Sequence, residues 1–214
     1  MRLGSADLRQ DTPPCAEAHA RYWDRLHELA AVLDGVPWLL AGGLAIPVTL
    51  GRFYRDHFDI DIIFPLEAFE VVEERMRAGG FRLWTYFPYS LFGRARGALH
   101  IPVRAGGWLA RRRMRKLKFR DASGRRKPPH LLSVIEALPY RIENGQYVTC
   151  DGRHRIPMAA PLRGHRYTTP AGHHIDCYHL SYVAYYKHLK TEPKHGEDLA
   201  VIDRFLRAEA PAAD

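Results

Sequence analysis

The stretch "GRFYRDHFDIDIIF", residues 51–64, carries two carboxylates in the apolar run with which it ends. The alternation of polar and apolar residues predicts a core strand over residues 58–64. Positions i and i+2 of a strand point to the same face, so Asp59 and Asp61 project side by side while the isoleucine between them faces the core. Two carboxylates about 6 to 7 Å apart repel each other unless a cation lies between them, and their oxygens suit Mg²⁺. The pair predicts half of a metal site; the alternative is two aspartates at a solvent edge, each fixed by an arginine.

A glycine pair, Gly42 and Gly43, stands upstream of this strand, after a short apolar strand predicted for residues 36–41. Glycine-rich turns and helix N-termini present backbone N–H groups to phosphate oxygens. We therefore expect the glycine pair to seat a triphosphate, with Arg52 and Arg55 offsetting its charge through their planar forks of donors. The sequence contains neither GxxxxGK[ST] nor GxGxxG, so it does not predict those phosphate-binding loops.

The composition is that of an ordinary globular protein, with 46% hydrophobic and 26% charged residues in 214. No apolar run reaches the roughly 18 residues that a bilayer span needs, and the N-terminus has no apolar core of a secretion signal. We expect a cytoplasmic protein without a membrane partner. Its three widely spaced cysteines are expected to stay reduced.

The positive charge is concentrated in residues 94–127, which hold 13 Lys and Arg against one acid. The rest of the chain is mildly acidic, with 19 basic and 23 acidic residues. Clustered cations attract polyphosphate, nucleic acid or another acidic partner, so RNA binding through this segment is one hypothesis. The alternative is a solvated strand pair or loop whose charge only aids solubility.

Periodicity and turn signals predict an α+β fold, a mixed β-sheet with flanking helices and a helical C-terminal end. Residues 150–174 are expected to form loops and hairpins, and residues 191–196 a break between the last two helices. Predicted helices cover residues 16–33, 65–80, 180–190 and 197–209; predicted strands cover residues 81–87, 97–103, 114–121 and 130–142. We divide the chain into a flexible tail (1–14), a core (15–140) and a C-terminal hairpin and helical region (141–214).

The segment "LLAGGLAIPVTLGRFYRDHFDIDIIF", residues 39–64, resembles the signature of the small nucleotidyltransferases of the DNA polymerase β superfamily. Its second half has the spacing GRxxRxHxDxD of the lincosamide and aminoglycoside nucleotidyltransferases, and it is less similar to the nucleotidyltransferase toxins of the abortive-infection type. The resemblance implies the nucleotidyltransferase fold and a Mg²⁺-dependent enzyme with two ions. Such an enzyme transfers a nucleoside monophosphate, AMP from ATP or the equivalent from another NTP, to a hydroxyl and releases pyrophosphate.

The C-terminal segment "GHHIDCYHLSYVAYYKHLKTEPKHGEDLAVI", residues 172–202, is similar to the closing pattern of this superfamily. Carried over residue by residue, the resemblance implies that Lys190 or Lys194 approaches the nucleotide phosphates. It also implies that Asp198 anchors the last helix. The alternative for the lysine-rich link is an exposed turn between helices.

A third carboxylate from a later strand usually completes the superfamily's site, as a ligand of the second metal or as general base. The comparable stretch here is "GRRKPPHLLSVIEALPY", which lacks an aspartate at the expected place. We nominate Glu136 as the base and keep Asp121 and Asp151 as substitutes. If none serves, the enzyme could use His130 or work with one metal, or the protein binds nucleotide without catalysis.

The acceptor implied by the resemblance is a small, antibiotic-like molecule with a hydroxyl group. A polycationic aminoglycoside should meet an acidic cleft, so the basic segment argues against one unless it faces away from the site. A neutral, lincosamide-like compound, an RNA such as tRNA, and phosphocholine-type transfer remain as alternatives.

Overall fold

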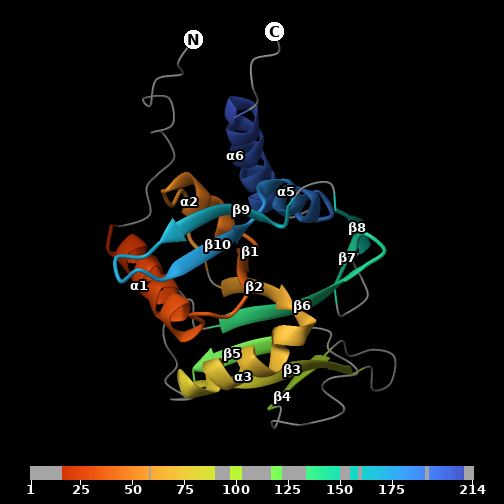
Figure 1. Ribbon diagram of the computed structural model, residues 1–214. Helices are drawn as coiled ribbons and strands as arrows, with labels where there is room; N and C mark the ends of the chain where they lie inside the picture. The colour runs from red at the N-terminus through yellow and green to blue at the C-terminus, as the bar shows by residue number, and fades with distance from the viewer. Residues whose placement is uncertain are drawn as a thin grey trace.

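The computed structural model describes residues 16–57, 59–89, 97–102, 117–121, 134–149, 155–158, 161–190 and 193–209. Within them the strands form one ten-stranded sheet in the order β4-β3-β5-β6-β2-β1-β10-β9, and β7 pairs with β6 and β8 (Figure 1). The strands are β1 (Leu39–Ala41), β2 (Asp59–Pro65), β3 (Phe81–Tyr89), β4 (Gly97–Pro102), β5 (Leu117–Asp121), β6 (Val134–Glu143), β7 (Gln146–Thr149), β8 (Arg155–Pro157), β9 (Arg163–Thr168) and β10 (His174–Tyr178). The helices are α1 (Ala16–Val32), α2 (Ala45–Leu50), η1 (Leu66–Ala68), α3 (Phe69–Ala78), α5 (Leu180–His188) and α6 (Pro193–Glu209).

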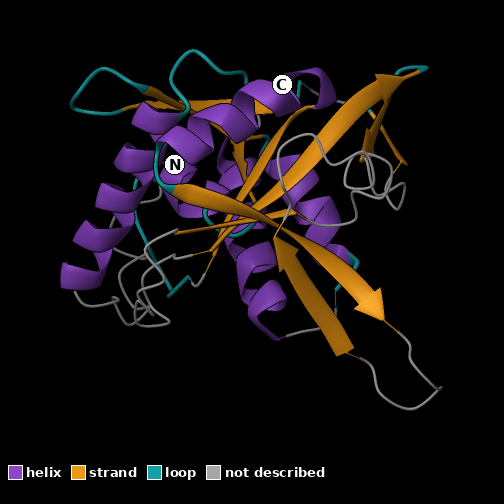
Figure 2. Ribbon diagram, turned by 90° about the horizontal axis from the view of Figure 1, so that it is seen from below, coloured by secondary structure: helices purple, strands orange, loops and turns teal. Residues whose placement is uncertain are grey.

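β2 lies at the centre of the sheet, antiparallel to β1 and parallel to β6. The register places Ala41 and Glu136 on either side of Asp61. Strands cross the middle of the molecule with helices on both sides of them (Figure 2). The two neighbours of β2 therefore bring the end of β1 and the start of β6 to the first residues of β2, where the carboxylates lie.

The core side of β2 is apolar because Ile60, Ile62 and Phe64 alternate with the aspartates. All three have no exposed surface, and they share one hydrophobic cluster with residues of α1 and α3. The opposite side begins with Asp59, which is exposed, and Asp61, which is partly buried. Burial of one face thus fixes which way the two carboxylates point.

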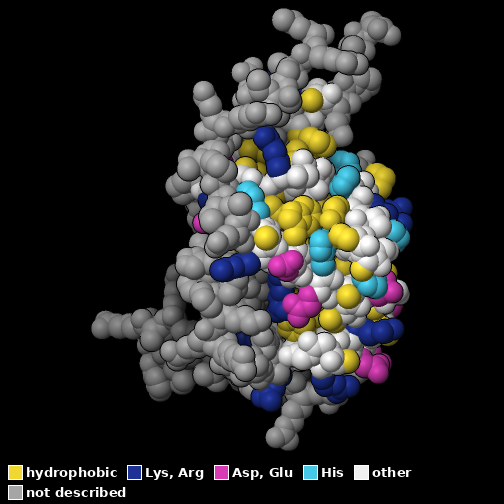
Figure 3. Space-filling view, turned by 90° about the vertical axis from the view of Figure 1, so that its left-hand side faces the viewer, with side chains coloured by type: hydrophobic (Ala, Val, Ile, Leu, Met, Phe, Trp, Pro, Cys, Tyr) yellow, Lys and Arg dark blue, Asp and Glu magenta, His cyan; other side chains and the backbone are white. Residues whose placement is uncertain are grey.

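Aromatic packing docks α1 on β9 and on the loop that precedes β2. The Trp23 and Tyr167 rings stack with centroids 4.7 Å apart, and Phe53 packs edge-on against Trp23 at 5.4 Å. The surface seen from the left-hand side of Figure 1 gathers hydrophobic and histidine side chains in its middle (Figure 3). The contact of Phe53 with Trp23 holds the loop that leads into β2 against α1.

The predicted α+β fold is confirmed, with helices and strands close to the ranges that periodicity predicts. The expected break over residues 191–196 is wrong for its last four residues, because α6 begins at Pro193. Proline is favoured in the first turn of a helix, and the buried His195 and Asp198 fix that turn against the body. Of the hairpins expected in residues 150–174, β9 and the turn after it lie in that range, and the antiparallel partner β10 begins at its last residue.

The division at residue 140 stays a prediction; β6 runs through that position, and β10 from the C-terminal part pairs with β1. The predicted tail, Asp151 and His130 lie outside the described residues, as does most of the segment 94–127. Among the described residues, none of the helices has both the length and the apolar composition that crossing a bilayer requires.

Candidate active site

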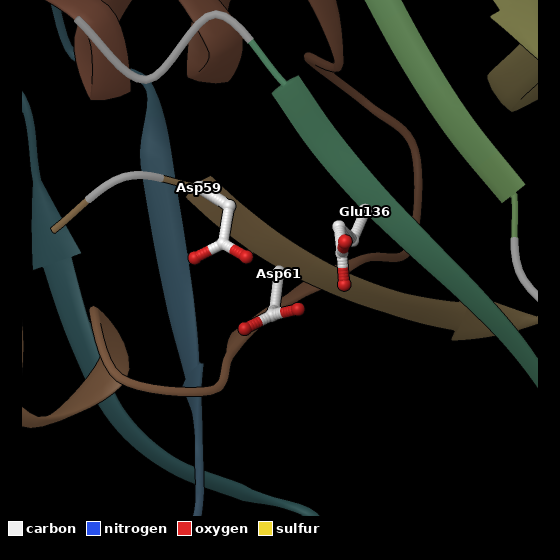
Figure 4. A group of neighbouring side chains, drawn as sticks. All are labelled: Asp59, Asp61 and Glu136. Atoms are coloured by element: carbon white, nitrogen blue, oxygen red, sulfur yellow. The ribbon is translucent and has the colours of Figure 1, made fainter. Parts of the chain in front are cut away.

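Three carboxylates from two neighbouring strands meet at one place on the sheet (Figure 4). Each of Asp59, Asp61 and Glu136 offers a carboxylate oxygen, and these oxygens lie within 4.8 Å of one another. Glu136 reaches the pair because β6 runs parallel to β2 with Glu136 directly across from Asp61. Residues paired across neighbouring strands project to the same face, so the register alone brings the third carboxylate to the first two.

The donor set fits a hard divalent cation. Three carboxylates this close repel one another, and oxygen ligands suit Mg²⁺ and similar ions. Lys118 on β5 offsets part of the charge, with its Nζ 2.9 Å from Glu136 Oε1. Asp59 is exposed, so the site is open to solvent and to a bound substrate on that side.

The glycine pair after β1 packs directly against this site. Gly42 has a φ of 62°, and a β-carbon there would lie 1.9 Å from Asp61 Oδ2. A β-carbon at Gly43 would lie 2.8 Å from Arg55 Nη2 and 3.1 Å from His57 Nδ1. Only glycine leaves room for the Asp61 carboxylate and the Arg55 guanidinium, so the turn lies immediately beside both.

A buried charge cluster centred on Asp198 supports the turn from behind. The Nε and Nη2 atoms of Arg55 donate to the two Asp198 oxygens at 2.7 and 2.8 Å, and the Tyr54 hydroxyl donates to Oδ1 at 2.6 Å. Lys187 of α5 completes the cluster with its Nζ 2.5 Å from Asp198 Oδ2. Asp198 has no exposed surface. It thus ties α6 to α5 and to the loop before β2, the anchoring position that the resemblance implies.

The basic residues expected to bind nucleotide occupy different surroundings. Arg55 is engaged with Asp198 and also donates from Nη1 to the Asp56 carbonyl, so it braces the turn. Arg52 is partly exposed in the turn after α2, and Lys190 and Lys194 are exposed on either side of the link between α5 and α6.

Lys187 is the charged residue of this region that sequence reasoning missed. It is 7% exposed and follows Leu180 and Val183 at spacings of seven and four residues. That spacing places the lysine on the apolar face of α5, where an unpaired charge would be costly. A lysine on the buried face of a predicted helix was therefore the available signal for a buried partner such as Asp198.

Burial also determines the charge state of His57, the histidine of the motif. His57 is 4% exposed, and burial followed by the charge of Arg55 lowers its pKa to about 3. Its backbone N–H donates to the Tyr22 hydroxyl at 3.1 Å, which fixes the loop on α1. His57 is therefore a neutral group packed beneath the glycine turn.

The Asp198 carboxylate is expected to make folding stability fall in acid. Burial opposes its ionisation, but hydrogen bonds from Arg55, Lys187 and Tyr54 outweigh burial and lower its pKa to about 2. A depressed carboxylate pKa stabilises the folded state above the unfolded pKa of 3.8, and this contribution disappears as the pH falls towards 2. It amounts to about 2 kcal/mol. Urea unfolding at pH 5, 4, 3 and 2.5 should show wild type losing its advantage over Asp198→Asn; a constant difference would contradict the assignment.

Known proteins resemble this chain in sequence over part of its length and in fold. A family model for aminoglycoside-2''-adenylyltransferase matches residues 25–91, which include β1, the glycine turn and β2. No curated protein matches the chain. The lincomycin-bound lincosamide antibiotic adenylyltransferase LnuA matches with a TM-score of 0.51 and 11% identity, over 90% of this chain and 98% of that chain. The structure of ANT(2'')-Ia with adenylyl-2''-tobramycin matches with a TM-score of 0.49 and 19% identity, over 88% and 91%.

At this level of identity the likeness to LnuA concerns the fold, and it extends over nearly all of both chains. The family match covers the part of the chain that carries Asp59, Asp61 and the glycine turn. The chain therefore has the nucleotidyltransferase fold and resembles the aminoglycoside and lincosamide nucleotidyltransferases.

Proposed function

We propose that this protein is a Mg²⁺-dependent nucleotidyltransferase that moves a nucleoside monophosphate, AMP from ATP, to a hydroxyl group of a small molecule. The observation that carries the proposal is the meeting of Asp59, Asp61 and Glu136 beside the Gly42–Gly43 turn. In this reaction the acceptor oxygen forms a bond to the α-phosphorus. The bond from that phosphorus to the bridging oxygen breaks, and pyrophosphate leaves.

We assign different roles to the three carboxylates according to their positions on β2 and β6. Asp59 and Asp61 would hold the Mg²⁺ ions, two as in related enzymes, which supply neutralisation of the triphosphate and of the leaving pyrophosphate. Glu136 lies across from Asp61 on the side away from β1, and it would accept the proton of the acceptor hydroxyl. Lys118 holds one Glu136 oxygen and so orients the carboxylate.

The triphosphate would lie on the β1 side of the carboxylates. The N–H groups of the turn after β1 would contact phosphate oxygens there, and the partly exposed Arg52 would offset the phosphate charge. Behind the turn, two cations, Arg55 and Lys187, surround the single carboxylate of Asp198, which leaves one net positive charge. A buried excess of positive charge favours a polyanion at the turn even though both cations are already hydrogen-bonded. Lys190 and Lys194, both exposed, would approach the phosphates, as the resemblance implies.

Substitution of Gly42 by alanine is expected to lower the transfer rate by about 10²-fold, because the added methyl group must displace the Asp61 carboxylate. Gly35→Ala is the matched control: Gly35 also has a positive φ, 73°, but nothing lies within 4 Å of its added carbon. Both variants should lose about 1 kcal/mol of stability from backbone strain. Steady-state kinetics and urea unfolding of the pair separate the two effects, and equal activity in both variants would argue against the proposed role of the turn.

The direct test of the activity is incubation with each α-³²P-labelled NTP and Mg²⁺, together with a panel of lincosamides, aminoglycosides and other hydroxyl compounds. Labelled product with stoichiometric pyrophosphate, absent in an Asp59→Asn/Asp61→Asn variant, would support the proposal. ATP is expected to be the best donor. Intact nucleotide binding without pyrophosphate release for any acceptor would show a nucleotide-binding protein without transferase activity.

A further inference from the structure

Two cations of the basic segment, Lys118 and Arg120 on β5, lie on the face of the sheet that carries the carboxylates. β5 alternates buried Leu117 and Phe119, 0% and 1% exposed, with the partly exposed Lys118 and Arg120. The buried pair belongs to the hydrophobic core with Ile60 and Ile62, so the two cations project to the side of the sheet that carries Asp59 and Asp61. The register confirms this direction, because Lys118 lies directly across from Glu136.

Positive charge continues across the sheet beyond Glu136. Arg120 on β5 pairs with Arg82 on β3, and Arg82 is exposed. The Arg120 guanidinium lies over the Trp84 ring, 5.6 Å from its centroid. The Nε of Arg120 is buried and has no hydrogen-bond partner among the described residues. The described side chains that alternate onto this face from β3 and β5 are thus an aromatic ring and three cations.

The charges of the described side chains on this face do not cancel. Lys118 is paired with Glu136, and a divalent cation would compensate the aspartates. Arg120 on the strand beside Glu136 and Arg82 one strand further then remain as positive charge on the side opposite the glycine turn. A general base must lie within hydrogen-bond reach of the hydroxyl that it deprotonates, so an acceptor bound at Glu136 extends towards these cations.

We propose that the acceptor is a hydroxyl compound that carries a phosphate group close to its reactive hydroxyl, and that Arg120 binds this phosphate. The proposal rests on the proposed transferase activity and specifies its acceptor. The Arg120 guanidinium lies over the Trp84 ring, and a guanidinium binds phosphate through a planar fork of N–H donors. A polycationic acceptor would instead place its ammonium groups against Arg120 and Arg82 and be repelled.

The test compares phosphorylated compounds with their unphosphorylated partners. Ribose 5-phosphate and ribose, AMP and adenosine, and a short single-stranded RNA are titrated calorimetrically into protein saturated with Mg²⁺ and α,β-methylene-ATP, which keeps the donor site filled. The phosphate should tighten binding by about 10-fold or more in wild type. Preference for the monophosphates indicates a free phosphate ester as the source, and preference for the RNA indicates a strand phosphate. No preference for any phosphorylated compound would overturn the proposal.

The same titrations are repeated with the variant Arg120→Gln. Arg141→Gln, a change at an exposed arginine of β6, is the matched control. The phosphate preference should disappear in Arg120→Gln and persist in Arg141→Gln, while Kd for the ATP analogue stays unchanged in both. A phosphate preference that survives Arg120→Gln would overturn the role of Arg120. Efficient transfer to tobramycin, unaffected by this variant, would overturn the proposed acceptor class and leave the transferase activity standing. An Arg120-dependent preference for phosphorylated compounds without any pyrophosphate release would support the phosphate site and overturn the transferase activity.

Discussion

Replacement of Asp61 by asparagine is expected to lower the rate of nucleotidyl transfer by about 10³-fold or more, with the fold intact. Asparagine keeps the size of the side chain but removes a charge from the group of three carboxylates whose oxygens lie within 4.8 Å of one another. A metal ion that neutralises transition-state charge contributes several kcal/mol, and every 1.36 kcal/mol corresponds to about 10-fold in rate. Loss of a shared ligand should remove most of that contribution.

The same variant has a second, independent readout in its stability. Without metal, Asp61→Asn should be as stable as wild type or more stable, because it relieves repulsion among the carboxylates. Added Mg²⁺ should raise the melting temperature of wild type and have little effect on the variant. Asp203→Asn, an exposed change on α6, is the control that should retain both activity and the Mg²⁺ response. An Asp61→Asn protein with wild-type kcat would rule out the metal site at this position.

Replacement of Asp198 by alanine is expected to destabilise the fold by about 3 to 5 kcal/mol, because it leaves Arg55 and Lys187 as buried charges without their shared partner. Tyr54 would also lose the acceptor of its 2.6 Å hydrogen bond. The loss should appear in the free energy of unfolding by urea and in the melting temperature. It should also weaken nucleotide binding, since Arg55 lies beside Gly43 in the turn.

Two further variants distinguish lost charge compensation from lost packing. Asp198→Asn keeps the shape of the side chain and one acceptor oxygen for Tyr54 and the Arg55 Nε, so it should cost less than alanine. The double variant Lys187→Met/Asp198→Asn removes one cation together with the carboxylate and should recover part of the stability lost in Asp198→Ala. Equal stability of Asp198→Ala and wild type would mean that the cluster does not hold α6 in place.

The local sequence pattern was sufficient to predict the part of the site that Asp59 and Asp61 form. Alternation in residues 58–64 predicted β2 and the shared face of Asp59 and Asp61, and burial of Ile60 and Ile62 agrees with it. The Gly42–Gly43 turn was also predictable, because glycine adopts the backbone conformations that a tight turn between a strand and a helix requires. The start of α6 was not, since Pro193 and its neighbours read equally well as a break.

The sequence by itself determined the β2 carboxylates, the glycine turn before them and the basic character of residues 94–127, because each depends on neighbours along the chain. Only the tertiary structure decided that Glu136 lies across from Asp61, that Lys187 joins Asp198, and that Lys118 and Arg120 face the site. The physical reason is that pairing between distant strands and the docking of helices are set by burial of apolar faces across the whole sheet. A register shift of one residue would turn Glu136 into the core and leave the aspartates without it.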